Sequence, residues 1–119
     1  MSPASTPAPY SGYALRPVVV AADLDSLRGP LHGRRQLPLH LDSSARPHYD
    51  FGSPRDRLQA YQLILLEAAD QADLKQWLHH HELVQLWRDL YLPRSVRRAW
   101  EREHAELAVL GAGPHVPQP

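Results

Sequence analysis

The sequence predicts a mainly α-helical protein, a small bundle of about four short helices preceded by an extended, β-hairpin-like arm. Two observations predict this fold class. Apolar residues recur at helical spacing through residues 53–108, and this stretch begins with a serine and a proline that favour a helix start. Residues 17–52 instead contain short β-branched or alternating runs interrupted by glycine and proline. We therefore divide the chain into an arm at 17–52 and a helical domain at 53–108.

Both ends of the chain are expected to be disordered tails. Residues 1–16 are rich in proline, alanine and serine, and residues 109–119 contain three prolines. Such compositions bury too little apolar surface to offset the conformational entropy lost on ordering. The roughly 90 residues between the tails are near the lower limit for a core without disulfides or metal. A partner is therefore expected to supply part of the stability.

The arm is predicted to contain a strand, a helical turn and an edge strand. Residues 17–21 form a β-branched apolar run, and residues 23–29 resemble a helical turn opened by aspartate and closed by glycine. Residues 35–41 alternate polar and apolar side chains around Pro38, which limits them to an edge strand or an extended arm. Residues 48–51 should be a short extended piece before the helices.

Four helices are predicted after Ser53, which is placed to cap the first of them, with Asp56 as the acid of a capping box. Asp70 repeats the cap signal for the second helix. The third should end at Leu90, before Leu92-Pro93, because the residue before a proline is disfavoured in helical conformation. The expected ranges are 54–69, a short helix from 70 that stops near the histidines at 79–81, 82–90, and 95–107.

Charge, cysteine content and hydropathy exclude several classes of function. Thirteen basic residues balance thirteen acidic ones, so free nucleic acid is not an obvious partner. The absence of cysteine excludes disulfides and thiolate zinc sites and is compatible with a reducing cytoplasm. Residues 1–17 lack the features of a signal peptide, and no run approaches the roughly 18 apolar residues of a membrane span. We expect a cytoplasmic protein without a membrane partner.

No arrangement in the sequence favours metal binding or catalysis. Imidazole is a common metal ligand, but consecutive helical residues at 79–81 point about 100° apart and cannot converge on one ion. A polar junction between helices is the alternative interpretation. Ser43, Ser44, His48 and Asp50 cluster in one loop, yet no nucleophile elbow, phosphate loop or zincin motif accompanies them. We expect these residues to form turns and caps, and we predict no enzyme, cofactor or metal site.

The last predicted helix carries a basic stripe that consists of Arg94, Arg97, Arg98 and Arg102. Together with the preceding helix it could form a helix-turn-helix, so the alternative function is a small DNA-binding transcriptional regulator that uses the helix at 95–107. Against this, acidic residues follow at once and would repel phosphate. At helical spacings Arg98 and Arg102 could pair with Glu101, Glu103 or Glu106.

The chain has many large aromatic side chains for so small a core, namely Trp77, Trp87, Tyr91 and Trp100. Most share periodic faces with leucines and should be buried. Tyr49 and Tyr91 lie at the ends of elements and are expected to be exposed contacts. The candidate partner-binding residues are Tyr49, Trp87, Tyr91, Arg94, Arg97 and Arg98.

A series of short motifs within about residues 37–107 resembles a group of small actinobacterial proteins encoded beside AbiEii-type nucleotidyltransferase toxins. The motifs include Leu37-Pro38, Tyr49-Asp50-Phe51, Asp56-Arg57-Leu58, Leu86-Trp87, Leu90-Tyr91-Leu92-Pro93, Val96-Arg97 and Ala99-Trp100. The resemblance implies a short antitoxin or an accessory protein that binds a nucleotidyltransferase-fold toxin and blocks its nucleotide or RNA-acceptor site. The long N-terminal arm departs from a minimal antitoxin. This protein-binding function and DNA binding are therefore the two hypotheses.

Overall fold

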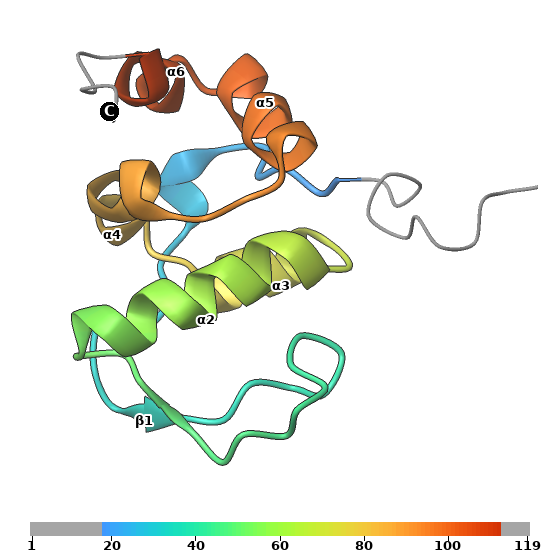
Figure 1. Cartoon of the computed structure of the whole chain (residues 1–119), viewed down its shortest axis with the longest axis vertical. Coiled ribbons are helices and arrows are strands. Elements are labelled where there is room, and N and C mark those ends of the chain that lie inside the picture. The colour runs from blue at the N-terminus through green and yellow to red at the C-terminus, as the bar shows by residue number, and fades with distance from the viewer. Residues whose placement is uncertain (1–17, 113–119) are drawn as a thin grey trace, which may run out of the picture.

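The computed structural model describes residues 18–112 and confirms a mainly helical fold in which a short antiparallel hairpin precedes the helices (Figure 1). The expected disorder of residues 1–16, and of the chain beyond residue 112, lies outside the described residues. The elements in chain order are η2 (Leu24–Ser26), β1 (Arg34–Arg35), β2 (Tyr49–Asp50), α2 (Pro54–Glu67), α3 (Gln71–Trp77), α4 (His80–Leu86), η3 (Trp87–Asp89), α5 (Arg94–Glu103) and α6 (Ala105–Ala112).

The first part of the arm contains the predicted helical turn but not the predicted strand. Asp23 caps η2 by accepting a hydrogen bond from the Asp25 amide at 3.0 Å. Residues 18–21 form no strand, because the groups that bind their backbone are side chains rather than a neighbouring strand. The side-chain amide of Gln71 donates to the Val20 carbonyl at 2.7 Å. Nε2 of the His104 ring donates to the Ala21 carbonyl at 2.6 Å.

The arm then passes close to the junction between α3 and α4, and Gly29 makes this approach possible. The Gly29 amide donates to the Leu78 carbonyl at 2.7 Å, and the His80 amide donates to the Leu27 carbonyl at 3.0 Å. A Cβ atom at Gly29 would lie 2.5 Å from the carbonyl carbon of Trp77. Only glycine therefore fits without displacing the backbone of the α3–α4 junction.

The hairpin is shorter than the sequence predicts. Strands β1 and β2 are two residues each, with Arg34 opposite Asp50 and Arg35 opposite Tyr49. Of the predicted edge strand at 35–41, only Arg35 lies in β1, because a turn begins at Pro38. The Pro38 carbonyl accepts hydrogen bonds from the Leu41 and Asp42 amides.

The start of α2 is capped as predicted, but its acidic residue has a different partner. Ser53 accepts a bond from the Asp56 amide at 3.4 Å, and Pro54 occupies the first turn. Asp56 does not return the bond to the Ser53 amide, which donates to the Asp50 carbonyl at 2.9 Å. The Asp56 carboxylate instead accepts a hydrogen bond from the Asp50 amide at 2.9 Å and pairs with Arg46 at 3.1 Å. Asp56 therefore ties the hairpin to α2.

The last predicted helix is two helices, and it extends beyond its expected end. His104 separates α5 from α6 in an extended conformation (φ −130°, ψ 103°), with its side chain bonded to the Ala21 carbonyl of the arm. Helix α6 continues to Ala112, whereas the sequence placed the start of a disordered tail at residue 109. Leu107 is fully buried and Leu110 packs against the core, so this apolar face stabilises the extra turn.

One hydrophobic core contains side chains from both the arm, residues 18–52, and the helices. The arm contributes Leu24, Leu27, Leu37 and Leu41, all buried among residues of the helices. The largest fully buried side chains of this core are Phe51, Tyr61, Trp87 and Trp100.

We predict that Gly29→Ala lowers the free energy of unfolding by about 1–3 kcal/mol, because the new methyl group meets backbone that must shift. Urea denaturation followed by tryptophan fluorescence measures the change. Gly52→Ala is the control, since a Cβ there would first meet a side-chain oxygen of Asp50, at 3.3 Å. Equal losses in the two variants would contradict a special close approach at Gly29.

Candidate functional site

The connection between η3 and α5 presents the most exposed aromatic side chain among residues 18–112. Tyr91 is 87% exposed, which confirms the predicted exposure of its ring. Its backbone is nevertheless fixed, because the Tyr91 amide donates to the Gln62 side chain of α2 at 2.7 Å. A residue whose backbone is already ordered loses less conformational entropy when a partner covers its side chain.

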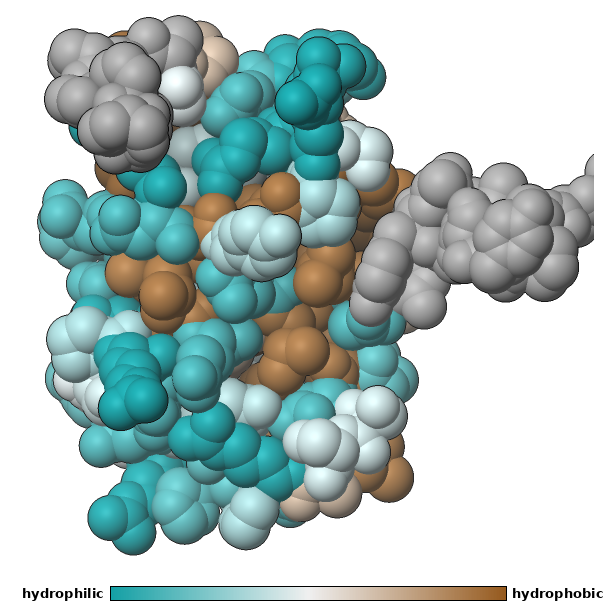
Figure 2. All heavy atoms as spheres, viewed as in Figure 1, coloured by the Kyte–Doolittle hydropathy of each residue, from teal (hydrophilic) through white to brown (hydrophobic). Residues whose placement is uncertain are grey.

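A cavity of about 650 Å³ lies beside Tyr91, between the end of α2 and the start of α5. Hydrophobic residues gather across the middle of this face, between α2 and α5 (Figure 2). The residues that line the cavity are Leu66, Tyr91, Leu92, Pro93, Arg94 and Arg97. It combines an apolar floor with a positively charged edge.

Trp87, a candidate partner-binding residue, is a core residue in this chain. Its side chain is fully buried, its ring centroid lies 6.3 Å from that of Trp100, and its indole N–H donates to Glu101 Oε2 at 2.9 Å. The prediction that it contacts a partner is therefore corrected, because the protein's own residues enclose the ring. The sequence indicates this burial, because Trp87 lies on the same helical face of residues 82–90 as the leucines.

Arg97 also serves the fold rather than the surface. Its side chain is 25% exposed and donates to the carbonyls of Trp87 and Leu90. The guanidinium carbon lies 5.0 Å from the centre of the Trp87 ring. A guanidinium nitrogen of Arg97 lies 3.8 Å from Glu101 Oε2. With these bonds made inside the chain, only the edge of Arg97 reaches the cavity.

The exposed basic stripe on α5 consists of Arg94, Arg98 and Arg102. None of the three makes an ion pair with another residue of 18–112, so the expected pairing with Glu101, Glu103 or Glu106 is not found. Glu101 binds Trp87 and Arg97 instead, and Glu106 binds His80. The sequence predictions omitted Arg102 as a binding residue, although a spacing of four residues places it on the face of Arg94 and Arg98.

Tyr49 is 4% exposed, which corrects the prediction that it is an exposed contact. Its hydroxyl donates to Asp42 Oδ2 at 2.6 Å, and the Arg46 guanidinium lies 4.0 Å from its ring centre. Burial, followed by the bond to Asp42, raises the pKa of Tyr49 to about 12. The pKa of Asp42 is lowered, because its bonds from Ser44 and Tyr49 outweigh the effect of burial.

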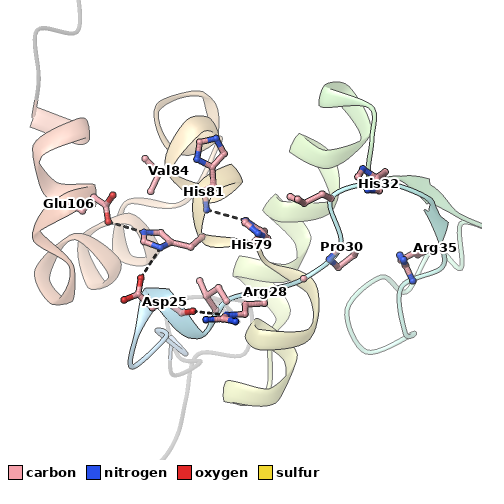
Figure 3. Close-up of a pocket in the computed structure, with 13 residues that line it drawn as sticks. Asp25, Arg28, Pro30, His32, Arg35, His79, His81, Val84 and Glu106 are labelled. Carbon is pink, nitrogen blue, oxygen red and sulfur yellow. Dashed lines mark hydrogen bonds and ion pairs between the residues drawn. The ribbon is translucent and has the colours of Figure 1, made fainter.

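The histidines at 79–81 line a second cavity, of about 760 Å³, where the arm meets α4 (Figure 3). His79 Nδ1 accepts a bond from the His81 amide at 3.2 Å. His80 lies between two carboxylates, with Asp25 3.2 Å from Nδ1 and Glu106 2.9 Å from Nε2. The rings of His79 and His81 point in different directions (Figure 3), and no group of metal-ligating side chains is found within 18–112. The run forms a polar junction between α3 and α4.

The polar loop before α2 is organised by turns. Ser44 Oγ donates to Asp42 Oδ1 at 2.6 Å, and Asp50 Oδ1 accepts from the Gly52 amide at 2.8 Å. These are the bonds of turn-forming side chains, as the sequence predicted. They do not join a serine to His48.

Comparison with known proteins finds no matching family model, no similar curated protein and no similar solved structure. Within residues 18–112, no helix is both long and apolar enough to cross a membrane.

We predict that the protein loses stability as the pH rises from 10 to about 12. Tyr49 and Tyr61 both have a pKa raised to about 12, mainly by burial, so the folded state keeps two protons that the unfolded state releases near pH 10. The stabilisation is fully present below pH 10. Urea unfolding at neutral pH and at about pH 11 measures the loss. Tyr49→Phe should reduce the difference between the two pH values, and an unchanged difference would contradict the assignment.

Proposed function

We propose that the chain is a non-catalytic protein-binding module, an antitoxin or accessory protein that neutralises a nucleotidyltransferase-fold toxin by direct binding. The observation that carries the proposal is the exposed Tyr91 beside a cavity that Arg94 also lines. Exposed aromatic and arginine side chains are enriched among the residues that dominate binding energy in protein interfaces. The toxin partner itself comes from the resemblance of residues 37–107.

The architecture supports binding rather than chemistry. The hydrogen bonds of Ser44 and Asp50 form turns, and His79 and His80 are bonded within the junction between α3 and α4. None of these groups faces the Tyr91 cavity. A binding module needs only a rigid surface, and the Gln62 bond supplies this at Tyr91.

The experiment that tests this function is co-expression with an AbiEii-type nucleotidyltransferase toxin, the class of partner that the resemblance implies. We expect the two proteins to co-purify and the growth defect caused by the nucleotidyltransferase to disappear. A nucleotidyltransferase that stays fully toxic and purifies alone would refute the proposal.

We predict that Tyr91→Ala weakens the complex about 30-fold or more, because an exposed ring that a partner buries is a typical interface hot spot. Calorimetric titration of the purified partners measures the dissociation constant. The free energy of unfolding should change by less than about 0.5 kcal/mol, since the ring is exposed in the free protein. Leu39→Ala is the matched control, because Leu39 is also exposed, at 65%, but lies in the arm.

DNA binding is the second candidate function, and the exposed stripe of Arg94, Arg98 and Arg102 favours it. Helix α5 has one arginine fewer for DNA contact than the sequence predicts. Arg97 donates to the carbonyls of Trp87 and Leu90, and these bonds hold its guanidinium away from a base edge. A mobility-shift assay with the DNA that lies upstream of the protein's own gene tests it. A shift that weakens with salt and disappears in Arg98→Gln would support the regulator.

A further inference from the structure

We infer that the Tyr91 cavity and the arginine stripe of α5 form one docking groove for an acidic segment of a partner protein, anchored by an apolar side chain. This inference rests on the proposed protein-binding function and names the chemistry of the segment that is bound. Arg94 belongs to both parts, since it lines the cavity and begins the stripe. Arg94 therefore joins the cavity to the stripe, and the two together are the docking groove.

The charge of the groove defines the first requirement on the partner. Arg94, Arg98 and Arg102 are exposed and make no ion pair within residues 18–112, whereas Arg97 on the same helix is paired with Glu101. Carboxylates of a partner are the groups that complete unpaired guanidinium groups by charge-assisted hydrogen bonds. The partner segment must therefore be acidic.

The spacing of the stripe defines the second requirement. Residues four apart on a helix are separated by about 6 Å along its axis, so the stripe spans about 12 Å. Carboxylates repeated at a similar interval, on every fourth residue of a helix or every second residue of a strand, would meet the three arginines in register.

The cavity defines the third requirement. Its floor is formed by Leu66, Leu92 and Pro93, and about 650 Å³ is enough volume for one large apolar side chain. Because the cavity lies at the Arg94 end, the apolar anchor must lie at one end of the acidic stretch. A nucleic acid supplies the charge but no aliphatic anchor, and its continuous backbone would also meet the exposed Glu103.

The two ends of the given sequence do not supply the acidic segment. Residues 1–17 and 113–119, which lie outside the described part of the chain, contain no aspartate or glutamate. Neither tail can therefore supply the carboxylates. A second copy of the chain could, through its own acidic surface residues, and this occupant would show as concentration-dependent dimerisation.

The test uses the full chain and a fluorescent synthetic peptide with one leucine followed by three glutamates at four-residue intervals. A matched peptide carries glutamines in place of the glutamates, and a third carries alanine in place of leucine. We expect the acidic leucine peptide to bind at least about tenfold more tightly than either control, as measured by fluorescence anisotropy, and its affinity to fall with added salt. Equal affinities for the three peptides, or no binding by any, would overturn the inference.

Charge reversal in the protein gives the second arm of the test. The Arg98→Glu variant should bind the acidic peptide at least about tenfold more weakly. It should also gain affinity for a peptide with lysines at the same positions. Arg55→Glu is the matched control, because Arg55 is exposed in the first turn of α2, where an acidic residue favours the helix. Equal effects of the two reversals would assign the binding to net charge and overturn the groove.

Further results would assign a different occupant to the groove, or would separate the groove from the toxin proposal. Labelled single-stranded or duplex DNA that binds more tightly than the acidic peptide, and is lost in Arg98→Glu, would make the groove a nucleic-acid site. Dimerisation that is lost in the same variant would make the occupant a second copy. If the toxin still binds Arg98→Glu with unchanged affinity, the proposed function stands and the groove assignment fails. If the groove binds the peptide but the toxin does not bind at all, the toxin proposal fails and the groove stands.

Discussion

The interaction on which the rest of the structure depends is the bonding of Arg97 to the end of η3. Its guanidinium donates to the carbonyls of Trp87 and Leu90, lies over the Trp87 ring and faces Glu101, which also accepts the indole N–H. A largely buried cation is stable only when such partners satisfy it. These bonds hold the start of α5 against the end of η3 and draw Trp87 inward. Within the connection between them, residues 90–93, Leu90 is buried and Tyr91 is exposed to solvent.

Helix α5 therefore divides its arginines between two tasks. Arg97 lies on the side that faces η3, while Arg94, Arg98 and Arg102 lie together on the exposed side. The formal charge of the whole chain is zero, so long-range attraction to any polyanion is weak. A local stripe on a neutral protein acts mainly at short range, where it selects carboxylates by position. This explains how a protein without net charge can still have a charge-specific surface.

The arm is part of the same cooperative unit as the helices. Leu24 and Leu27 enter the common core, and the bonds between Gly29 and Leu78 and between His104 and Ala21 join segments far apart in the chain. Small domains bury a limited fraction of their surface, so each such contact is a sizeable part of the total stability. The polar junction at His80, between Asp25 and Glu106, belongs to this docking of the arm. It gives His80 a role in the packing of the arm against α4 and α6.

The sequence by itself determined the helical class and the starts of most elements. The caps at Asp23, Ser53 and Asp70 are bonds between residues two or three apart, so the local sequence contains all the information that they require. The tertiary structure alone decided which aromatic side chains are exposed. Tyr49 and Tyr91 both lie at element ends, but Tyr49 packs into the core and contacts Asp42 and Arg46, whereas Tyr91 is exposed. It also decided the break at His104, whose partner Ala21 is 83 residues away. Choices between residues with the same local pattern depend on contacts across the chain, and periodicity does not specify these contacts.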